Sequence, residues 1–206
     1  SVVWIFALMC PAMTMAQAGC KTLVIEAKDT IGGGMRSSYL TLDGFVHDRC
    51  SAIHPMGMAS PFFRSLNLTS KGIDWIHSSA PLAHPLDDGT AVMLERSIDV
   101  TADGLGSDTQ SYRNLMKPVV GGWDKLIEEI LGPSHFPRHP LALSRLGLMA
   151  SQSVDSLVRS RFKAIGARAL FAGISAHSIM PMDRAGGAAV GLLLGAAGHA
   201  VGWPMA

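Results

Sequence analysis

The sequence has few charged residues, and their signs nearly cancel. Asp, Glu, Lys and Arg make up 16% of the 206 residues, and the formal net charge is +1. Proteins that hold nucleic acid by its phosphates carry a surplus of basic residues. The composition therefore predicts no nucleic-acid partner. With 48% apolar residues, it predicts either a large buried core or a surface that faces a membrane.

Cysteine is also scarce. The chain has three cysteines, Cys10, Cys20 and Cys50, which is an odd number without the spacing of a metal site. A disulfide scaffold needs paired cysteines in an oxidising compartment. The cysteine content therefore favours a reducing compartment, and we expect a cytoplasmic protein.

The familiar arrangements of catalytic side chains are missing as well. The sequence has no Ser-His-Asp order, no paired carboxylates and no Walker loop. The histidines that invite a chemical role are His47, His54, His84, His177 and His199. Their spacings fit no zinc pattern, and two of them precede proline, a position typical of turns. The sequence thus identifies no catalytic residue and no metal site.

What the sequence does contain is a glycine-rich segment from Lys21 to Ser37. It begins with the apolar run Leu23–Ile25, the pattern of a strand buried on both faces. Glu26 ends this run, where an acid in a nucleotide-binding βαβ unit accepts hydrogen bonds from a ribose. Gly32–Gly34 then allow close approach of the backbone to a ligand. Arg36 follows and would place a cation beside a diphosphate.

This segment resembles the FAD-dependent amine oxidase and phytoene desaturase superfamily. The residues that match its acid and its Gly-Gly-x-x-Arg-Ser turn are Glu26, Gly33, Gly34, Arg36 and Ser37, with one residue fewer between glycine and arginine. Further segments resemble the phytoene dehydrogenase-like branch, and they are 45–55, 81–89, 169–173 and 198–204. The resemblance extends from about Ala16 to the last residues of the sequence.

The resemblance implies an FAD-dependent oxidoreductase that transfers a hydride or electrons from an apolar small-molecule substrate, such as a polyene, to flavin. Glu26 would hold the adenosine ribose. The residues that would line the diphosphate and the flavin are Gly32, Gly33, Gly34, Arg36 and Ser37. The implied fold is α/β, with a Rossmann-like FAD-binding βαβ start, antiparallel substrate-domain hairpins and a helical insertion. The corresponding segments are 1–60, 61–105 and 106–206.

The pattern of turns and caps predicts the remaining elements. Hairpins are expected at Asp43-Gly44, between strands Ser38–Leu42 and Phe45–Arg49, and at Asp87-Asp88-Gly89, between Leu82–Leu86 and Thr90–Leu94. Ser60 and Ser97 are predicted helix N-caps. A strand is expected at Ile73–Ile76. Helices are expected at Ser111–Leu131, with a break at Gly121-Gly122, and at Leu141–Ser160, Arg161–His177 and Gly186–Val201. The apolar stretches around Phe62-Phe63 and Leu141–Met149 are interpreted as core.

The start of the chain departs from the dinucleotide-binding pattern. Val2–Phe6 is predicted to be a strand and Leu8–Ala18 a helix, which is the expected order. The three glycines of Gly-x-Gly-x-x-Gly, however, fall on Val3, Ile5 and Leu8. The branched side chain of Ile5 would intrude where the phosphate should lie. Members of the resembled family are also longer, with a second flavin-contacting segment near their C-terminus, so the resemblance implies an incomplete fold. The alternative hypothesis is therefore a non-catalytic, truncated remnant that binds no cofactor.

Two alternatives concern membranes and export. Val2–Met9 followed by Ala16-Gln17-Ala18 has features of a signal peptide, although no positive residue precedes the apolar run. Gly187, Gly191 and Gly195 in the segment Gly186–Val201 are spaced by four, a pattern typical of close helix packing. We expect a buried or membrane-dipping helix there rather than a span. A membrane-attached interaction protein is the third hypothesis, and peripheral membrane contact is part of it.

Overall fold

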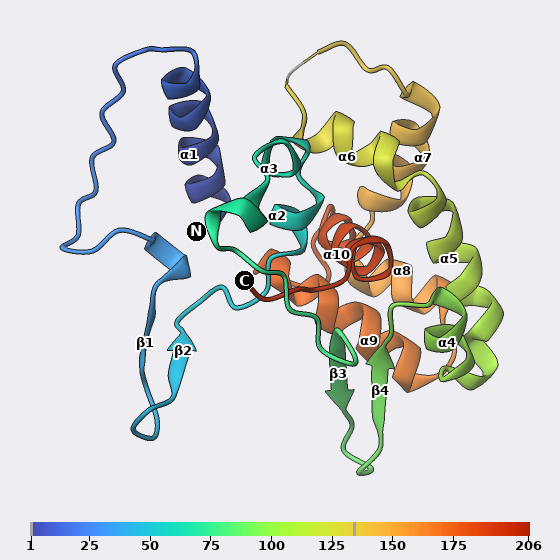
Figure 1. The fold of residues 1–206 in the computed structure, drawn as a ribbon. Helices are drawn as coiled ribbons and strands as arrows, with labels where there is room; N and C mark the ends of the chain where they lie inside the picture. Colours follow the sequence, from blue (N-terminus) through green and yellow to red (C-terminus); the bar gives the residue numbers. More distant parts are fainter. Residues whose placement is uncertain (1, 134) are drawn as a thin grey trace. The chain divides into compact units, whose positions relative to one another are not determined.

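The computed structural model describes the backbone of residues 2–133 and 135–206, and the side chains from Cys10 onward within those ranges. The fold is mixed α/β and mainly helical (Figure 1). The strands in the described ranges form two separate two-stranded antiparallel sheets. The chain divides into two compact units. The first unit comprises the residues up to His54 together with Ala206, and the second unit comprises Pro55–Met205.

The first unit contains one long helix and one hairpin. The elements are α1 (Val2–Gln17), the 3-10 turn η1 (Gly33–Met35), β1 (Ser37–Tyr39) and β2 (Val46–Asp48). Ser37 pairs with Asp48, and Tyr39 pairs with Val46. Gly44 has a φ of +86° between the two strands, which is the left-handed conformation that this turn requires of glycine. The predicted hairpin is confirmed, with strands shorter than expected.

The sequence predicted two strands before this hairpin, Val2–Phe6 and Leu23–Glu26, and both predictions are wrong. Val2–Phe6 lies within α1, and Leu23–Glu26 has no regular secondary structure. Leu23, Val24 and Ile25 are 83%, 57% and 83% exposed. A strand needs a neighbour for its backbone N–H and C=O groups, and in the described part of the chain no strand pairs with this segment. The parallel strands of a nucleotide-binding βαβ unit are therefore not formed in this structure.

The second unit contains nine helices and one hairpin in its described residues. The hairpin consists of β3 (Leu82–Pro85) and β4 (Ala91–Leu94). The α-helices are α2 (Pro55–Ala59), α3 (Pro61–Ser65), α4 (Ile98–Asp103), α5 (Thr109–Gly121), α6 (Trp123–Leu131), α7 (Pro140–Ala150), α8 (Val154–Arg161), α9 (Ile165–Ser175) and α10 (Ala188–Ala200). Short 3-10 turns are η2 (Leu68–Lys71), η3 (Gly106–Asp108) and η4 (Ala176–Ser178).

Helix α10 is the centre of the second unit (red in Figure 1). It packs against α2, α5, α6, α7, α8 and α9. Its glycines make these approaches possible. A Cβ added at Gly191 would collide with the Ser175 hydroxyl on α9. A Cβ at Gly195 would lie 3.1 Å from Met116 Cε on α5, and one at Gly198 would lie 2.6 Å from Leu94 Cδ2 on β4. A buried or membrane-dipping helix was expected at Gly186–Val201, and the structure has a buried, closely packed helix there with the shorter bounds Ala188–Ala200.

The hairpin of β3 and β4 also follows its sequence signal closely. Leu82 pairs with Leu94, and Pro85 pairs with Ala91. Both strands contact α9, and Leu94 is fully buried.

The two predicted helix N-caps are confirmed. The Ser60 hydroxyl accepts a hydrogen bond from the Phe63 N–H at 3.5 Å, and the Ser97 hydroxyl accepts one from the Val100 N–H at 3.3 Å.

Other predictions in the second unit are only partly correct. The helix break at Gly122 is confirmed, because α5 ends at Gly121 and α6 begins at Trp123. The single helix expected at Leu141–Ser160 is two helices, since Ser153 starts α8 by accepting a hydrogen bond from the Ser156 N–H at 3.1 Å. The strand expected at Ile73–Ile76 is wrong, and only one bridge, between Ile76 and Met205, is formed there.

Two buried polar contacts connect the helices of the second unit. The fully buried carboxylate of Asp108 accepts hydrogen bonds from the backbone N–H groups of Lys163 at 2.9 Å and Ala164 at 2.7 Å. The Tyr112 hydroxyl on α5 lies 2.8 Å from His199 Nε2 on α10. His199 Nδ1 lies 3.3 Å from the Arg96 carbonyl oxygen. A carbonyl can only accept, so Nδ1 carries the proton and Nε2 accepts from Tyr112.

Candidate functional site

Two of the residues predicted to bind a cofactor, Glu26 and Arg36, form an ion pair in the first unit. Arg36 Nη2 lies 3.5 Å from Glu26 Oε1, with the Arg36 side chain 18% exposed and that of Glu26 32% exposed. Glu26 Oε1 also accepts a hydrogen bond from the Lys28 N–H at 2.9 Å. Among the described residues, Glu26 Oε2 has no hydrogen-bond partner. One carboxylate oxygen therefore remains to accept hydrogen bonds from a ligand.

The glycine turn positions the arginine of this pair. Gly32 and Gly33 have φ values of +113° and +53°, a region that favours glycine. A Cβ on Gly32 would lie 3.3 Å from Arg36 Cγ. Arg36 donates from Nε, at 3.0 Å, and from Nη2 to the Thr30 carbonyl oxygen. Within the described part of the chain, Nη1 donates to no group, so the guanidinium keeps donors for an anion.

The hairpin supports the end of this turn. The Ser51 N–H donates to the Gly34 carbonyl oxygen at 3.1 Å, and the Arg49 N–H donates to the Arg36 carbonyl oxygen at 2.9 Å. The Ser37 hydroxyl donates to Asp48 Oδ1 at 2.6 Å. The structure thus brings Glu26, Gly32 and Arg36 together, whereas the Ser37 side chain is used within the hairpin.

An adenosine diphosphate group fits the donor set of this cluster only in part. Glu26 offers an acceptor suited to ribose hydroxyls, and Arg36 offers donors suited to phosphate. A dinucleotide site also needs a glycine-rich turn between a strand and a helix. The positions of that turn, residues 3, 5 and 8, all lie within α1, and the side chain of Ile5 lies outside the described residues.

The histidines lie at structural positions. His47 Nε2 lies 2.7 Å from the Thr41 hydroxyl, and His177 Nδ1 lies 3.1 Å from the Ile174 carbonyl oxygen. Burial lowers the pKa of His199, and burial followed by the neighbouring His177 lowers the pKa of His84. Burial also lowers the pKa of His54, against a smaller opposite effect of Asp48. These shifts favour neutral rings packed in the fold.

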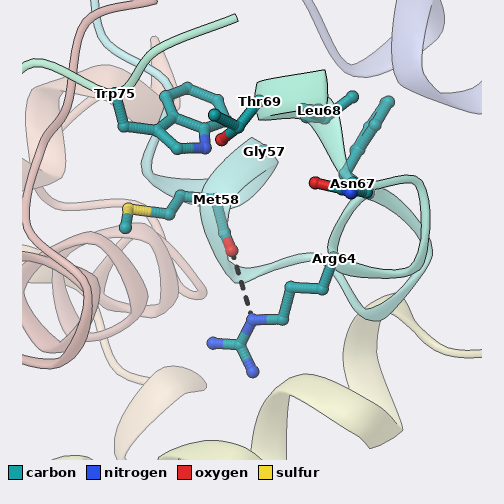
Figure 2. Close-up of a pocket in the computed structure, with 8 residues that line it drawn as sticks. Gly57, Met58, Arg64, Asn67, Leu68, Thr69 and Trp75 are labelled. Atoms are coloured by element: carbon teal, nitrogen blue, oxygen red, sulfur yellow. Dashed lines mark hydrogen bonds between the residues drawn. The ribbon is translucent and has the colours of Figure 1, made fainter. Parts of the chain in front are cut away.

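A small pocket of about 210 Å³ lies between α2, α3 and the segment after them (Figure 2). Its walls include Met58, Asn67 and Trp75. Figure 2 shows the Arg64 side chain at one edge, where its Nε donates to the Met58 carbonyl oxygen at 3.2 Å. Arg64 also lies 3.7 Å from Asp124. Arg64, the cation of this pocket, thus interacts with groups of the protein itself. No acid or histidine is among the described residues that line the pocket.

A larger groove lies among α5, α6 and α7, with a volume of about 1120 Å³. The interpretation of the whole stretch Leu141–Met149 as core is wrong, because part of this stretch lines the groove. Leu146 is buried, but Leu141 and Leu148 are 85% and 74% exposed and line the groove. The sequence signal for this arrangement is Arg145, which lies between the two leucines at helical spacing.

The described residues contain no candidate metal site and no candidate membrane span. No group of three or more His, Cys, Asp or Glu side chains there could hold a metal ion. No helix there is both long enough and apolar enough to cross a membrane.

Comparisons with protein-family models, with curated proteins and with solved structures gave no match.

Proposed function

We propose that this chain is an FAD-dependent oxidoreductase of the phytoene dehydrogenase-like type, and that Glu26 and Arg36 hold the adenosine end of FAD. The observation that carries this proposal is the 3.5 Å contact between Glu26 and Arg36 beside a turn with two left-handed glycines. The resemblance of the same segment to flavoenzymes, noted in the sequence, is the reason for assigning the contact to FAD.

Each residue has a defined part in the proposed site. The free oxygen of Glu26 accepts hydrogen bonds from the adenosine ribose. Arg36 turns its remaining donors toward the diphosphate, and its charge offsets that of the phosphates. Gly32 keeps the turn close to the Arg36 stem, where a side chain would displace it. Bound flavin would accept a hydride or electrons from an apolar substrate.

The first test is the visible absorption spectrum of the purified chain after incubation with FAD and removal of excess. Stoichiometric retained flavin is the expected result. ADP should displace the flavin and FMN should not, because the proposed contacts are made to the adenosine half. Glu26→Ala and Arg36→Ala should each weaken FAD binding by about tenfold, the size of one lost charge-assisted hydrogen bond.

Arg49→Ala is the matched control in the same unit. Arg49 donates to Ser38 at 3.1 Å and is not part of the Glu26 pair, so its removal should leave FAD affinity unchanged. Equal loss of affinity in Arg36→Ala and Arg49→Ala would mean that the fold of the hairpin, and not the proposed contact, is being measured. Absence of any retained FAD would contradict the proposal.

A second candidate function has its own supporting observation. The strands of the βαβ unit are replaced by α1 and by the exposed segment Leu23–Ile25. This arrangement favours a non-catalytic remnant of such an enzyme that binds no cofactor. The two candidates predict opposite results in the FAD experiment. The remnant predicts no retained flavin and no stabilisation of the fold by FAD in a thermal melt.

A further inference from the structure

The groove in the second unit is built mainly by three consecutive helices, α5, α6 and α7, and Arg161 at the end of α8 completes its lining. Helix α5 contributes Asn114 and Pro118, α6 contributes Lys125, and α7 contributes Leu141 and Arg145. Residues three or four apart on a helix share a face. The lining residues of α7 continue at Leu148 and Met149, so α7 faces the groove along most of its length, and Gln152 follows just after the helix.

The walls of the groove are mainly apolar. The apolar side chains that define it are Leu115, Pro118, Val119, Leu126, Leu141 and Leu148. Leu115, Val119 and Leu126 are buried in the floor, whereas Leu141 and Leu148 remain largely exposed. Exposed leucines along a hollow favour a ligand that covers them, because covering apolar surface is favourable in water.

The charges of the groove all have one sign. Lys125, Arg145 and Arg161 line it, and no Asp or Glu is among its described lining residues. In the part of the chain that the structure describes, none of the three forms an ion pair. The three cations come from different helices, α6, α7 and α8. An apolar groove with three unpaired cations complements a ligand that has an alkyl chain and an anionic head.

We propose that this groove binds a long-chain carboxylate of the fatty-acid type. The alkyl chain lies over Leu141 and Leu148, and the carboxylate is bound by the cations, with an arginine able to donate two parallel hydrogen bonds to it. Ligand pockets typically have volumes of about 300–1,000 Å³, so a groove of about 1120 Å³ has room for an extended chain. A neutral polyene would use the apolar wall but leave the cations without a partner.

This proposal is independent of flavin binding. All groove residues lie between Asn114 and Arg161, in the second unit, and the flavin proposal concerns Glu26 and Arg36 in the first. Failure of one experiment therefore leaves the other standing.

Isothermal titration calorimetry of the full chain with monomeric dodecanoate is the direct test. We expect saturable binding at one site. Dodecanol, which has the same chain without the charge, should bind at least about tenfold more weakly, because it lacks the charge-assisted contacts. Equal affinities for the acid and the alcohol would overturn the proposal, as would absence of binding.

Variants locate the site. Arg145→Glu and Lys125→Glu lie on exposed positions of different helices, and each should lower dodecanoate affinity by about tenfold or more while far-ultraviolet circular dichroism stays unchanged. Arg184→Glu is the matched control, since Arg184 is exposed and outside the groove. Equal effects in Arg145→Glu and Arg184→Glu would overturn the assignment.

Binding to phosphatidylserine vesicles in a flotation assay, without binding of monomeric dodecanoate, would overturn the proposal and show that the groove is a membrane contact instead.

Discussion

The two units of this chain contain similar apolar sequence signals with opposite outcomes. In the second unit, α10 is surrounded by six helices, and residues such as Leu192 and Ala196 are fully buried. In the first unit, the apolar run Leu23–Ile25 forms no regular structure and is exposed. The difference shows that an apolar run specifies burial only when the same fold supplies a partner surface.

The packing of α10 is the feature of the second unit that is easiest to break. Gly191→Leu should destabilise the chain by about 3 kcal/mol or more, because the new side chain would displace the Ser175 hydroxyl and meet the Phe171 ring. Urea unfolding followed by circular dichroism measures this loss. Gly147→Ala, in α7, is the control, since a Cβ there has no neighbour within 4 Å. It should stabilise the chain by about 0.5–1 kcal/mol. Similar losses in both variants would contradict close packing at α10.

Acid should weaken the second unit through two histidines, the buried His199 and the half-buried His84. Burial lowers the pKa of His199 and of His84 below the ordinary value of 6.5. The unfolded chain then binds more protons than the folded chain as the pH falls below about 6.5, so stability is complete above that value and decreases below it. The groups that face these rings are Tyr112 and the Arg96 carbonyl for His199, and His177 for His84.

Thermal melts at pH 7.5 and pH 5.5 check this expectation, and the melting temperature should be lower at pH 5.5. His199→Gln should reduce the difference between the two pH values, because glutamine does not titrate and its amide can still contact Tyr112. If the variant lost as much stability on acidification as the parent chain does, His199 would not be a source of the pH dependence.

Local sequence signals predicted local structure well. Asp43-Gly44 and Asp87-Asp88-Gly89 specify their turns through glycine conformation, and both hairpins formed. Ser60 and Ser97 begin helices because a hydroxyl satisfies a free N–H at the helix start. The same rule, applied to Ser153 with Asp155 in the following turn, would have divided the long helix expected at Leu141–Ser160.

The predictions failed for strands and for a groove that depend on distant partners. The strands at Val2–Phe6 and Leu23–Glu26 required each other as neighbours, and neither formed. The motif predicted a ribose ligand at Glu26 and a phosphate ligand at Arg36 but no contact between the two side chains, and the structure places them 3.5 Å apart. The groove was not predicted, because the apolar residues of α7 were interpreted as core. Only the placement of α5 and α6 beside them reveals a lined hollow.

The smallest effect should come from the apolar run of the first unit. Leu23→Ser should change the free energy of unfolding by no more than about 0.5 kcal/mol, because 83% of the Leu23 surface is already exposed. The same substitution at Leu157, which is fully buried in α8, should cost several times as much, about 2–5 kcal/mol. Urea unfolding of both variants gives the comparison. A loss above about 1 kcal/mol in Leu23→Ser would mean that the run is buried in solution.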